Sequence, residues 1–507
     1  MKHIYALGAA AAGLLGLAGG AAAQTFTPGN LVVSRSVYQD VGQAAQLQVG
    51  SNLPDSKTGT TPYKAVADGS YPNVFNNASV DGSFGVTSPI FLDQLTASGS
   101  YVSSYAIPTS EIVTSFPSKS ELGLNLSTDG TALTFMGYTT APGTLDVSNS
   151  YTPGSSETGN FVTTAPTYRA VFQINADGSS SVTQTSAYSG NNARNAILDT
   201  VHNQYLTVGN AGNGKGDGTI PVDNGVQSIT PGQAATANGT QTTPVGNYNI
   251  TQNGYAADKQ TKDNNFRGET VFDNTLYITK GSGGNGINTV YQVGQTGTLP
   301  TGTNNPITIL PGFSTTLAKS TTGNVFHPFG LFFANATTLY VADEGNQSLS
   351  DTAASNANAG LEKWSFSGSQ WNLDYTLTNG LSLDNPYAVP GYTFNTETDG
   401  LRNLTGQVNA DGTVSLYAIT STVSDAGDQG ADPNKLVAIS DTLGFTSASQ
   451  ASGEEFSTLE AAGYGQVLRG VSFAPQAVPE ASSAVGMGLS LLGLLGFFAR
   501  KRVLAAK

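Results

Sequence analysis

The chain has 507 residues and a formal net charge of −14 at pH 7, with 61 Gly, no Cys and only 11% charged residues. The absence of Cys excludes a disulfide scaffold, a thiol nucleophile, a zinc ribbon and an iron–sulfur cluster. The acidic charge disfavours nucleic acids and anionic membrane surfaces as partners, because both are polyanions.

The first segment, residues 1–23, is typical of a secretory signal peptide. Lys2 and His3 precede an apolar stretch over residues 4–18, and Ala21 and Ala23 supply the small-x-small pattern before Gln24. We therefore expect export and cleavage by signal peptidase. An N-terminal membrane anchor is the alternative, although the apolar run is short and is interrupted by Gly.

The body, residues 24–477, is rich in Gly, Thr, Ser, Asn and Val, a composition that favours short strands over helices. One pattern recurs at intervals of roughly 70 residues: a start residue, an apolar strand, a turn, and a strand containing Tyr or Phe. The starts are Glu121, Arg194, Arg267, His327, Arg402 and Arg469. Hairpins with alternating polarity lie between them at residues 89–107, 168–188, 289–310, 361–377 and 435–445.

This repetition predicts an all-β fold, a β-propeller of about six four-stranded blades, with seven as an alternative. The start at Arg469 has no second strand before the tail, so we expect it to pair with N-terminal strands near residues 31–37 and 89–107. Residues 43–77 and 209–255 are predicted to be loop insertions, the second of which hides an outer hairpin. A β-sandwich array and a β-helix are the other folds considered, but the repeats are too long and irregular for a β-helix.

Four stretches of the body, residues 26–33, 88–107, 127–143 and 189–198, resemble secreted propeller-like proteins of bacterial surfaces. That group has no assigned activity, so the resemblance supports the fold and adds nothing on chemistry.

Each start residue precedes an inner strand, so the starts are expected to gather on one face near the central axis. Four Arg and one His then surround the channel mouth: Arg194, Arg267, His327, Arg402 and Arg469. One interpretation is an anion-binding site, because guanidinium groups match carboxylate or sulfate oxygens in pairs. The other is that each Arg ties its blade to a neighbour. His327 is also a candidate for a general base, whereas His202 is expected in a solvated turn.

Calcium is the one metal that we consider, because two loops contain several hard oxygen ligands. The candidates are Asp343 and Asp351 in one loop and Asp425, Asp428 and Asp432 in another. Neither loop matches an EF-hand, and Asp is also common in turns. With two His after residue 23, a multi-His site is excluded.

Two Gly-rich segments partly match nucleotide-binding motifs. Residues 281–286 fit G-x-G-x-x-G, but a strand rather than a helix is expected to follow. Residues 209–215 nearly fit a P-loop, but Gly216 replaces the Ser or Thr that binds magnesium. Both are interpreted as ordinary loops.

The last segment, residues 478–507, combines a short motif, an apolar run over residues 484–499 and a basic end. The motif is Val478, Pro479 and Glu480, and the basic end is Arg500, Lys501 and Arg502. This order resembles the PEP-CTERM sorting tail, which implies transient anchoring in the membrane and processing by an exosortase-like protease. Ala481 stands where that family usually has Pro. A plain C-terminal anchor is the alternative.

Together these features predict an exported, surface-sorted propeller with a binding or scaffolding role in the cell envelope or extracellular matrix. Its expected partners are an anionic glycan or an envelope protein. The alternative is a secreted lyase or hydrolase that acts on an anionic polysaccharide, with His327 or a nearby Tyr as the base.

Overall fold

The computed structural model describes a large part of the body of the chain. The ranges are residues 26–38, 52–53, 63–64, 86–116, 120–155, 165–212, 223–236, 242–320, 325–349, 356–425 and 430–477. The predicted signal peptide and sorting tail, with Asp351 and Asp428, lie outside them. Within these ranges, no helix has both the length and the apolar character to span a membrane.

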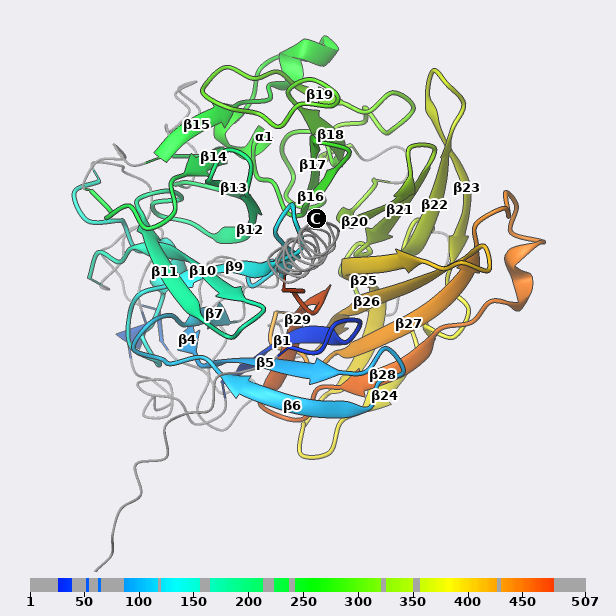
Figure 1. Cartoon of the computed structure of the whole chain (residues 1–507), viewed down its shortest axis with the longest axis horizontal. Coiled ribbons are helices and arrows are strands. Elements are labelled where there is room, and N and C mark those ends of the chain that lie inside the picture. The colour runs from blue at the N-terminus through cyan, green and yellow to red at the C-terminus, as the bar shows by residue number, and fades with distance from the viewer. Residues whose placement is uncertain are drawn as a thin grey trace, which may run out of the picture.

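Six sheets stand radially around a central axis, as Figure 1 shows. The first contains β29 (Gln466–Phe473), β1 (Leu31–Val37), β5 (Ile90–Leu95) and β6 (Tyr101–Ala106), and the second β8 (Asn125–Leu126), β9 (Ala132–Tyr138), β10 (Arg169–Asn175) and β11 (Ser180–Thr185). The third contains β12 (Ala193–Asp199), β13 (Gln204–Gly209), β14 (Gly225–Ile229) and β15 (Thr242–Gly246), and the fourth β16 (Glu269–Phe272), β17 (Thr275–Lys280), β18 (Thr289–Val293) and β19 (Ile307–Ile309).

The fifth sheet contains β20 (Pro328–Asn335), β21 (Thr338–Asp343), β22 (Gly360–Phe366) and β23 (Trp371–Leu377). The sixth contains β25 (Asn395–Val408), β26 (Thr413–Ser424), β27 (Lys435–Thr442) and β28 (Ser457–Ala461), with β24 (Pro386–Ala388) added beside β25. Two small sheets pair β2 (Asn52–Leu53) with β3 (Tyr63–Lys64) and β4 (Val86–Ser88) with β7 (Thr114–Phe116). A four-residue helix, α1, covers Gln260–Asp263. The fold is therefore an all-β propeller of six blades.

The two ends of the described body close the ring in the first blade. The C-terminal strand β29 pairs antiparallel with β1, with Leu31 opposite Phe473 and Val37 opposite Gln466. On its other side, β1 pairs with β5. This confirms the predicted closure, because β29 takes the inner position of a blade whose other strands come from the N-terminal part.

The insertion at residues 209–255 also holds an outer hairpin as predicted, β14 and β15. The strand expected after Gly286 is β18. One detail differs: residues 435–445 are not a hairpin. Strand β27 alone occupies this segment, and it pairs with β28. The connection between the two strands is longer than predicted and contains a short 3-10 helix at Ala451–Gly453.

Apolar side chains pack between adjacent blades, so each sheet has a buried surface on both faces. Leu92 of the first blade packs with Phe135 of the second, and Leu206 of the third packs with Ile278 of the fourth. The remaining three interfaces and the closing one have equivalent clusters. The core is a closed circle of interfaces, and each blade depends on both of its neighbours.

Polar contacts close to the axis join the inner or second strand of one blade to the inner-strand backbone of the next; we call this set of contacts the waist. Five side chains donate to backbone carbonyls of the following blade: Ser34 to Leu122, Thr134 to Ala196, Asn195 to Arg267, Thr279 to Phe329 and Asn403 to Arg469. Glycines allow the strands to approach here. A Cβ atom on Gly268 would lie 2.0 Å from the carbonyl oxygen of Phe329, well inside contact distance.

Candidate functional site

The start residues lie on one side of the waist, which we call the Arg face. Every inner strand runs away from this face. Glu121, Arg267 and His327 precede their strands and Arg194 is the second residue of β12, whereas Arg402 and Arg469 lie within β25 and β29, which begin earlier on this side. Hairpin geometry returns the chain to the same face after the second strand of each blade. The loops that follow β13, β17, β21 and β26 therefore surround the same channel mouth.

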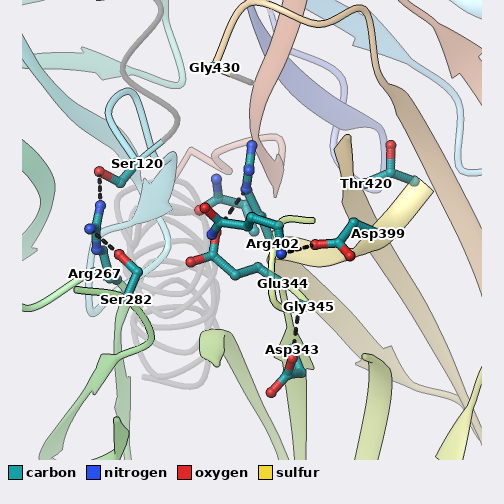
Figure 2. Close-up of polar contacts among 12 residues, drawn as sticks. Ser120, Arg267, Ser282, Asp343, Glu344, Gly345, Asp399, Arg402, Thr420 and Gly430 are labelled. Atoms are coloured by element: carbon teal, nitrogen blue, oxygen red, sulfur yellow. Dashed lines mark hydrogen bonds and ion pairs between the residues drawn. The ribbon is translucent and has the colours of Figure 1, made fainter. Parts of the chain in front are cut away.

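Arg194 and Arg267 converge on one hydroxyl group at this mouth. The Nε atom of Arg194 lies 2.9 Å from Ser120 Oγ, and Nη1 of Arg267 lies 2.5 Å from the same atom. Arg194 also donates to the carbonyl of Phe266 at 2.7 Å. Arg267 donates through Nη2 to Ser282 Oγ, as Figure 2 shows. Its Nε has no hydrogen-bond partner among the described residues.

Lys280 adds a third cation beside these two Arg side chains. It is fully buried at the end of β17, and its Nζ donates to Ser282 O at 3.0 Å and to Asn288 Oδ1 at 2.8 Å. Burial, with the nearby charges of Arg267 and Arg194, lowers the pKa of Lys280 to about 7. The same two causes, burial and then the Arg267 charge, lower the pKa of Arg194.

We call Arg194, Arg267, Lys280, Ser120 and Ser282 the Arg267 cluster. Within the described part of the chain, the hydrogen-bond partners of its three cations are neutral oxygens only. Each Ser hydroxyl accepts from a guanidinium group and keeps its own proton for donation. The cluster therefore presents positive charge and hydroxyl donors without an opposing carboxylate in contact.

The other two Arg side chains tie blades together. Arg402 lies within β25 of the sixth blade, and its Nε is 3.0 Å from Oε2 of Glu344, a residue that follows β21 of the fifth blade. Both side chains are buried. Arg469 of the first blade donates to the carbonyl of Gly430, in the loop between β26 and β27. These contacts fit the interpretation of the Arg positions as inter-blade ties.

Two buried carboxyl groups lie near these cations. Glu121 accepts from Tyr138 Oη, from Asn192 Nδ2 at 2.6 Å and from Ser115 N at 3.2 Å. Burial outweighs these bonds and raises its pKa to about 7. Asp399 accepts from Gln347 N at 2.7 Å, and burial likewise raises its pKa to about 7.

His327 is held in place through its backbone. Its N–H donates to Asp343 Oδ2 at 2.6 Å, and its carbonyl accepts from Glu344 N at 2.9 Å. The ring is half-buried. His202 lies in the turn between β12 and β13 as expected, and its Nδ1 is 2.6 Å from Asp199 Oδ2.

The Asp residues considered for calcium are used by their own loops where the structure describes them. Asp343 also accepts from Gly345 N at 2.9 Å, and Asp432 accepts from Tyr392 Oη and Ser424 Oγ, both at 2.6 Å. Asp425 is exposed. In the described ranges, no group of three or more His, Asp or Glu side chains is arranged to hold a metal ion.

Sequence reasoning missed several residues of the Arg face. Ser120, Ser282 and Lys280 lie in or beside loops, where no repeat pattern distinguishes them. It also missed Arg169 at the start of β10, which is fully buried and donates to the carbonyls of Ser148, Ser150, Thr167 and Asn191. That set of carbonyls identifies Arg169 as a structural residue.

The chain matches no protein-family model and no curated protein sequence. Among solved structures, it is similar to a candidate 6-phosphogluconolactonase from Bacteroides uniformis, with 10% identity and a TM-score of 0.28 over 65% of this chain and 87% of that one. A protein from Lactobacillus plantarum has 11% identity and a TM-score of 0.29 over 88% and 99% of the two chains. The endosialidase of phage phi92 has 10% identity and a TM-score of 0.26 over 78% and 64%. The propeller assignment therefore stands on the strand pairing itself.

Proposed function

We propose that this protein is an exported propeller of the cell envelope or extracellular matrix that binds an anionic group at the Arg267 cluster. The observation that supports this is the set of neutral partners around Arg194, Arg267 and Lys280. Glu121, Glu344 and Asp263 act on these cations electrostatically, but none of them is a hydrogen-bond partner, and burial still lowers the pKa of each cation. An anion at the mouth offsets this cost of burial, so the folded protein is prepared to bind one.

The donors suit a carboxylate or sulfate group. The hydroxyl protons of Ser120 and Ser282 can each donate to an anion oxygen beside the two guanidinium groups. A polysaccharide with repeated carboxylates offers such groups in the envelope or matrix. We therefore propose an acidic glycan as the ligand.

The test is thermal unfolding of the purified protein with oligogalacturonate, and with a neutral dextran of similar size as the control ligand. A ligand that binds only the folded state raises the unfolding midpoint. We expect oligogalacturonate to raise it and dextran to leave it unchanged. The shift is expected to disappear in Arg267→Ala and to persist in Lys319→Ala, which removes the same charge from an exposed position. A shift that survives in Arg267→Ala contradicts the proposal.

The proposed export and sorting to the cell envelope rest on the two ends of the chain. Residues 1–23 supply the export signal and residues 478–507 the sorting tail, with exosortase-like processing implied by the resemblance of that tail. Deletion of residues 478–507 is expected to release the protein from the envelope into the medium. Unchanged envelope association of the deleted form, measured by fractionation, rules out a sorting role for the tail.

A lyase or hydrolase acting on the same glycan is the second candidate. It requires a positioned base, and the contacts that hold His327 are made by its backbone. We therefore favour binding over turnover. Incubation with oligogalacturonate separates the two: new reducing ends or unsaturated products that His327→Gln abolishes indicate the enzyme.

A further inference from the structure

A lysine and an aspartate meet inside the interface between the fifth and sixth blades. Lys363 lies on β22 and Asp441 on β27, and their side chains are 1% and 0% exposed. The Nζ atom of Lys363 lies 2.7 Å from Asp441 Oδ2. It also donates to the carbonyls of Thr442 and Leu443, at 2.8 and 3.1 Å. These bonds hold the nitrogen against a carboxyl group that belongs to a different blade and lies 78 residues away in the sequence.

Two tyrosine hydroxyl groups donate to the same carboxyl group. Tyr375 Oη lies 2.6 Å from Asp441 Oδ1, and Tyr340 Oη donates to Oδ2. Tyr340 and Tyr375 lie directly opposite Lys363 on the two flanking strands, β21 and β23, so the three side chains share one face of the fifth blade. Both rings are close to Nζ, with centroids at 5.6 and 5.3 Å. Apolar side chains of both blades surround the group, so the pair is shielded from water.

A second carboxyl group lies against that of Asp441. Glu454 follows the short helix at Ala451–Gly453 and accepts from Thr442 N at 2.8 Å. Its Oε2 atom is enclosed, and its carboxyl group is within hydrogen-bond contact of Asp441. Burial, with the adjacent Asp441 carboxyl, raises the pKa of Glu454 to about 7. Near neutral pH this group can therefore both accept and donate a proton.

We propose that Lys363 and Asp441 form an intramolecular isopeptide bond, a covalent link between the fifth and sixth blades. Transfer of one proton converts the ammonium–carboxylate pair into an amine and a carboxylic acid, a change that costs less in a site without water than in solvent. The amine nitrogen then attacks Cγ of Asp441. The hydroxyl groups of Tyr340 and Tyr375 stabilise the negative charge that develops on the carboxyl oxygens. This inference is independent of the anion site proposed above.

The step needs no oxidant, reductant or co-reactant. The bond that forms joins Lys363 Nζ to Asp441 Cγ, and the bond that breaks is one Cγ–O bond of the same carboxyl group. The nitrogen gives up one proton, which Glu454 accepts and delivers to the departing oxygen. That oxygen also carries the proton of the acid, so it leaves as water. The products are one amide and one water molecule, and Glu454 returns to its starting state.

The test is mass spectrometry of the denatured full protein, with Lys363→Arg as the reference. After allowance for the substitution, we expect the unmodified protein to be lighter than the reference by the mass of one water. Digestion with trypsin is expected to leave the chain uncleaved at Lys363 and to give a branched peptide that joins it to the segment containing Asp441. This branched peptide is measured on the unmodified protein, so it does not depend on the folding of any variant.

Two neighbouring glutamates provide a matched pair of variants. Glu454→Gln is expected to lose most of the linked form, whereas Glu455→Gln, at an exposed position, is expected to keep it. Lys435→Arg, which replaces a half-buried lysine over the ring of Tyr387, is also expected to keep it.

The proposal is overturned if the unmodified protein shows no loss of water relative to Lys363→Arg, or if water is lost without the branched peptide. Complete linkage in Glu454→Gln would overturn the role of Glu454 in proton transfer.

Discussion

Arg194 and Arg267 begin neighbouring blades, yet both donate to Oγ of Ser120, at 2.9 and 2.5 Å. Ser120 precedes β8 of the second blade, whereas Arg267 precedes β16 of the fourth, so this contact reaches past the third blade. Two guanidinium groups that share one neutral acceptor repel each other, and the Arg267 charge accordingly lowers the pKa of Arg194. The fold therefore holds two guanidinium groups close together at the channel mouth despite their repulsion.

The partners of each Arg predict a contrast between two Ala variants. Arg402→Ala removes the guanidinium group that lies 3.0 Å from the buried carboxylate of Glu344, so we expect a loss of about 3–5 kcal/mol in the free energy of unfolding. Arg267→Ala removes a cation whose partners are hydroxyls and relieves the repulsion, so we expect a change within about 1 kcal/mol. Denaturant titration of both variants measures the difference. Equal losses would show that Arg267 is a structural tie and not a ligand-binding residue.

Anion binding at the Arg267 cluster is expected to weaken as the pH rises through 7. Lys280 has its pKa near 7 and loses its charge over this range, while Glu121, also near 7, gains a negative charge. Both changes disfavour an anion, so we expect about a tenfold loss of oligogalacturonate affinity between pH 6 and pH 8. Isothermal titration across this range measures it. Lys280→Met is expected to bind oligogalacturonate more weakly at pH 6, and its affinity is expected to change less with pH. An unaltered pH profile would show that Lys280 does not cause the pH dependence.

Stability is also expected to depend on pH, through the buried carboxyl groups. The folded-state pKa of Glu121 and of Asp399 is about 7, above their ordinary values of 4.5 and 3.8. The stability from such groups is complete below the unfolded pKa and is lost as the pH rises through 7. Lys280, whose pKa is lowered, acts only above pH 7 and in the opposite direction.

We therefore expect the free energy of unfolding to be at least about 2 kcal/mol lower at pH 7.5 than at pH 5. Denaturant titration at the two pH values measures this. The net acidic charge acts in the same direction, so Glu121→Gln is the control that isolates one group. Its profile is expected to be flatter than that of the unmodified protein, and an equal slope would assign the effect to net charge alone.

The sequence was sufficient to predict the blades because each one repeats a local pattern. Every start residue is followed by an inner strand, and the isolated start at Arg469 required a partner elsewhere, which is β1. The length of the connection between β27 and β28 was not predictable in the same way. Loops carry no periodicity, so their course depends on contacts that only the assembled ring provides.

The candidate site was likewise predictable only in part from the sequence. Direction along the strands was enough to place Arg194 and Arg267 on one face, but which oxygens they meet depends on loops from other blades. Ser120 belongs to such a segment, and nothing in its local sequence indicates a shared acceptor.

Close approach at the waist predicts a steric effect at Gly268. A methyl group there would lie 2.0 Å from Phe329 O and 3.0 Å from Thr279 Oγ1, which itself bonds that carbonyl. Gly268→Ala is expected to lower the free energy of unfolding by about 1–3 kcal/mol, since backbone of two blades must separate. Gly444→Ala, where a Cβ meets nothing within 4 Å, is the matched control. Equal denaturation midpoints for the two variants would mean that the waist tolerates expansion.

The closing blade predicts a sharp dependence on the last strand. A chain that ends at Gly465 lacks β29, so β1 loses its inner partner and the apolar side chains of Leu31 and Val33 lose their cover. Because each blade packs against two neighbours, we expect loss of cooperative unfolding and not a local change. A chain that ends at Ala477 keeps β29 and is expected to unfold with the midpoint of the full protein, measured by circular dichroism on heating. A cooperative transition in the shorter chain, at a similar temperature, would show that five complete blades are stable without closure.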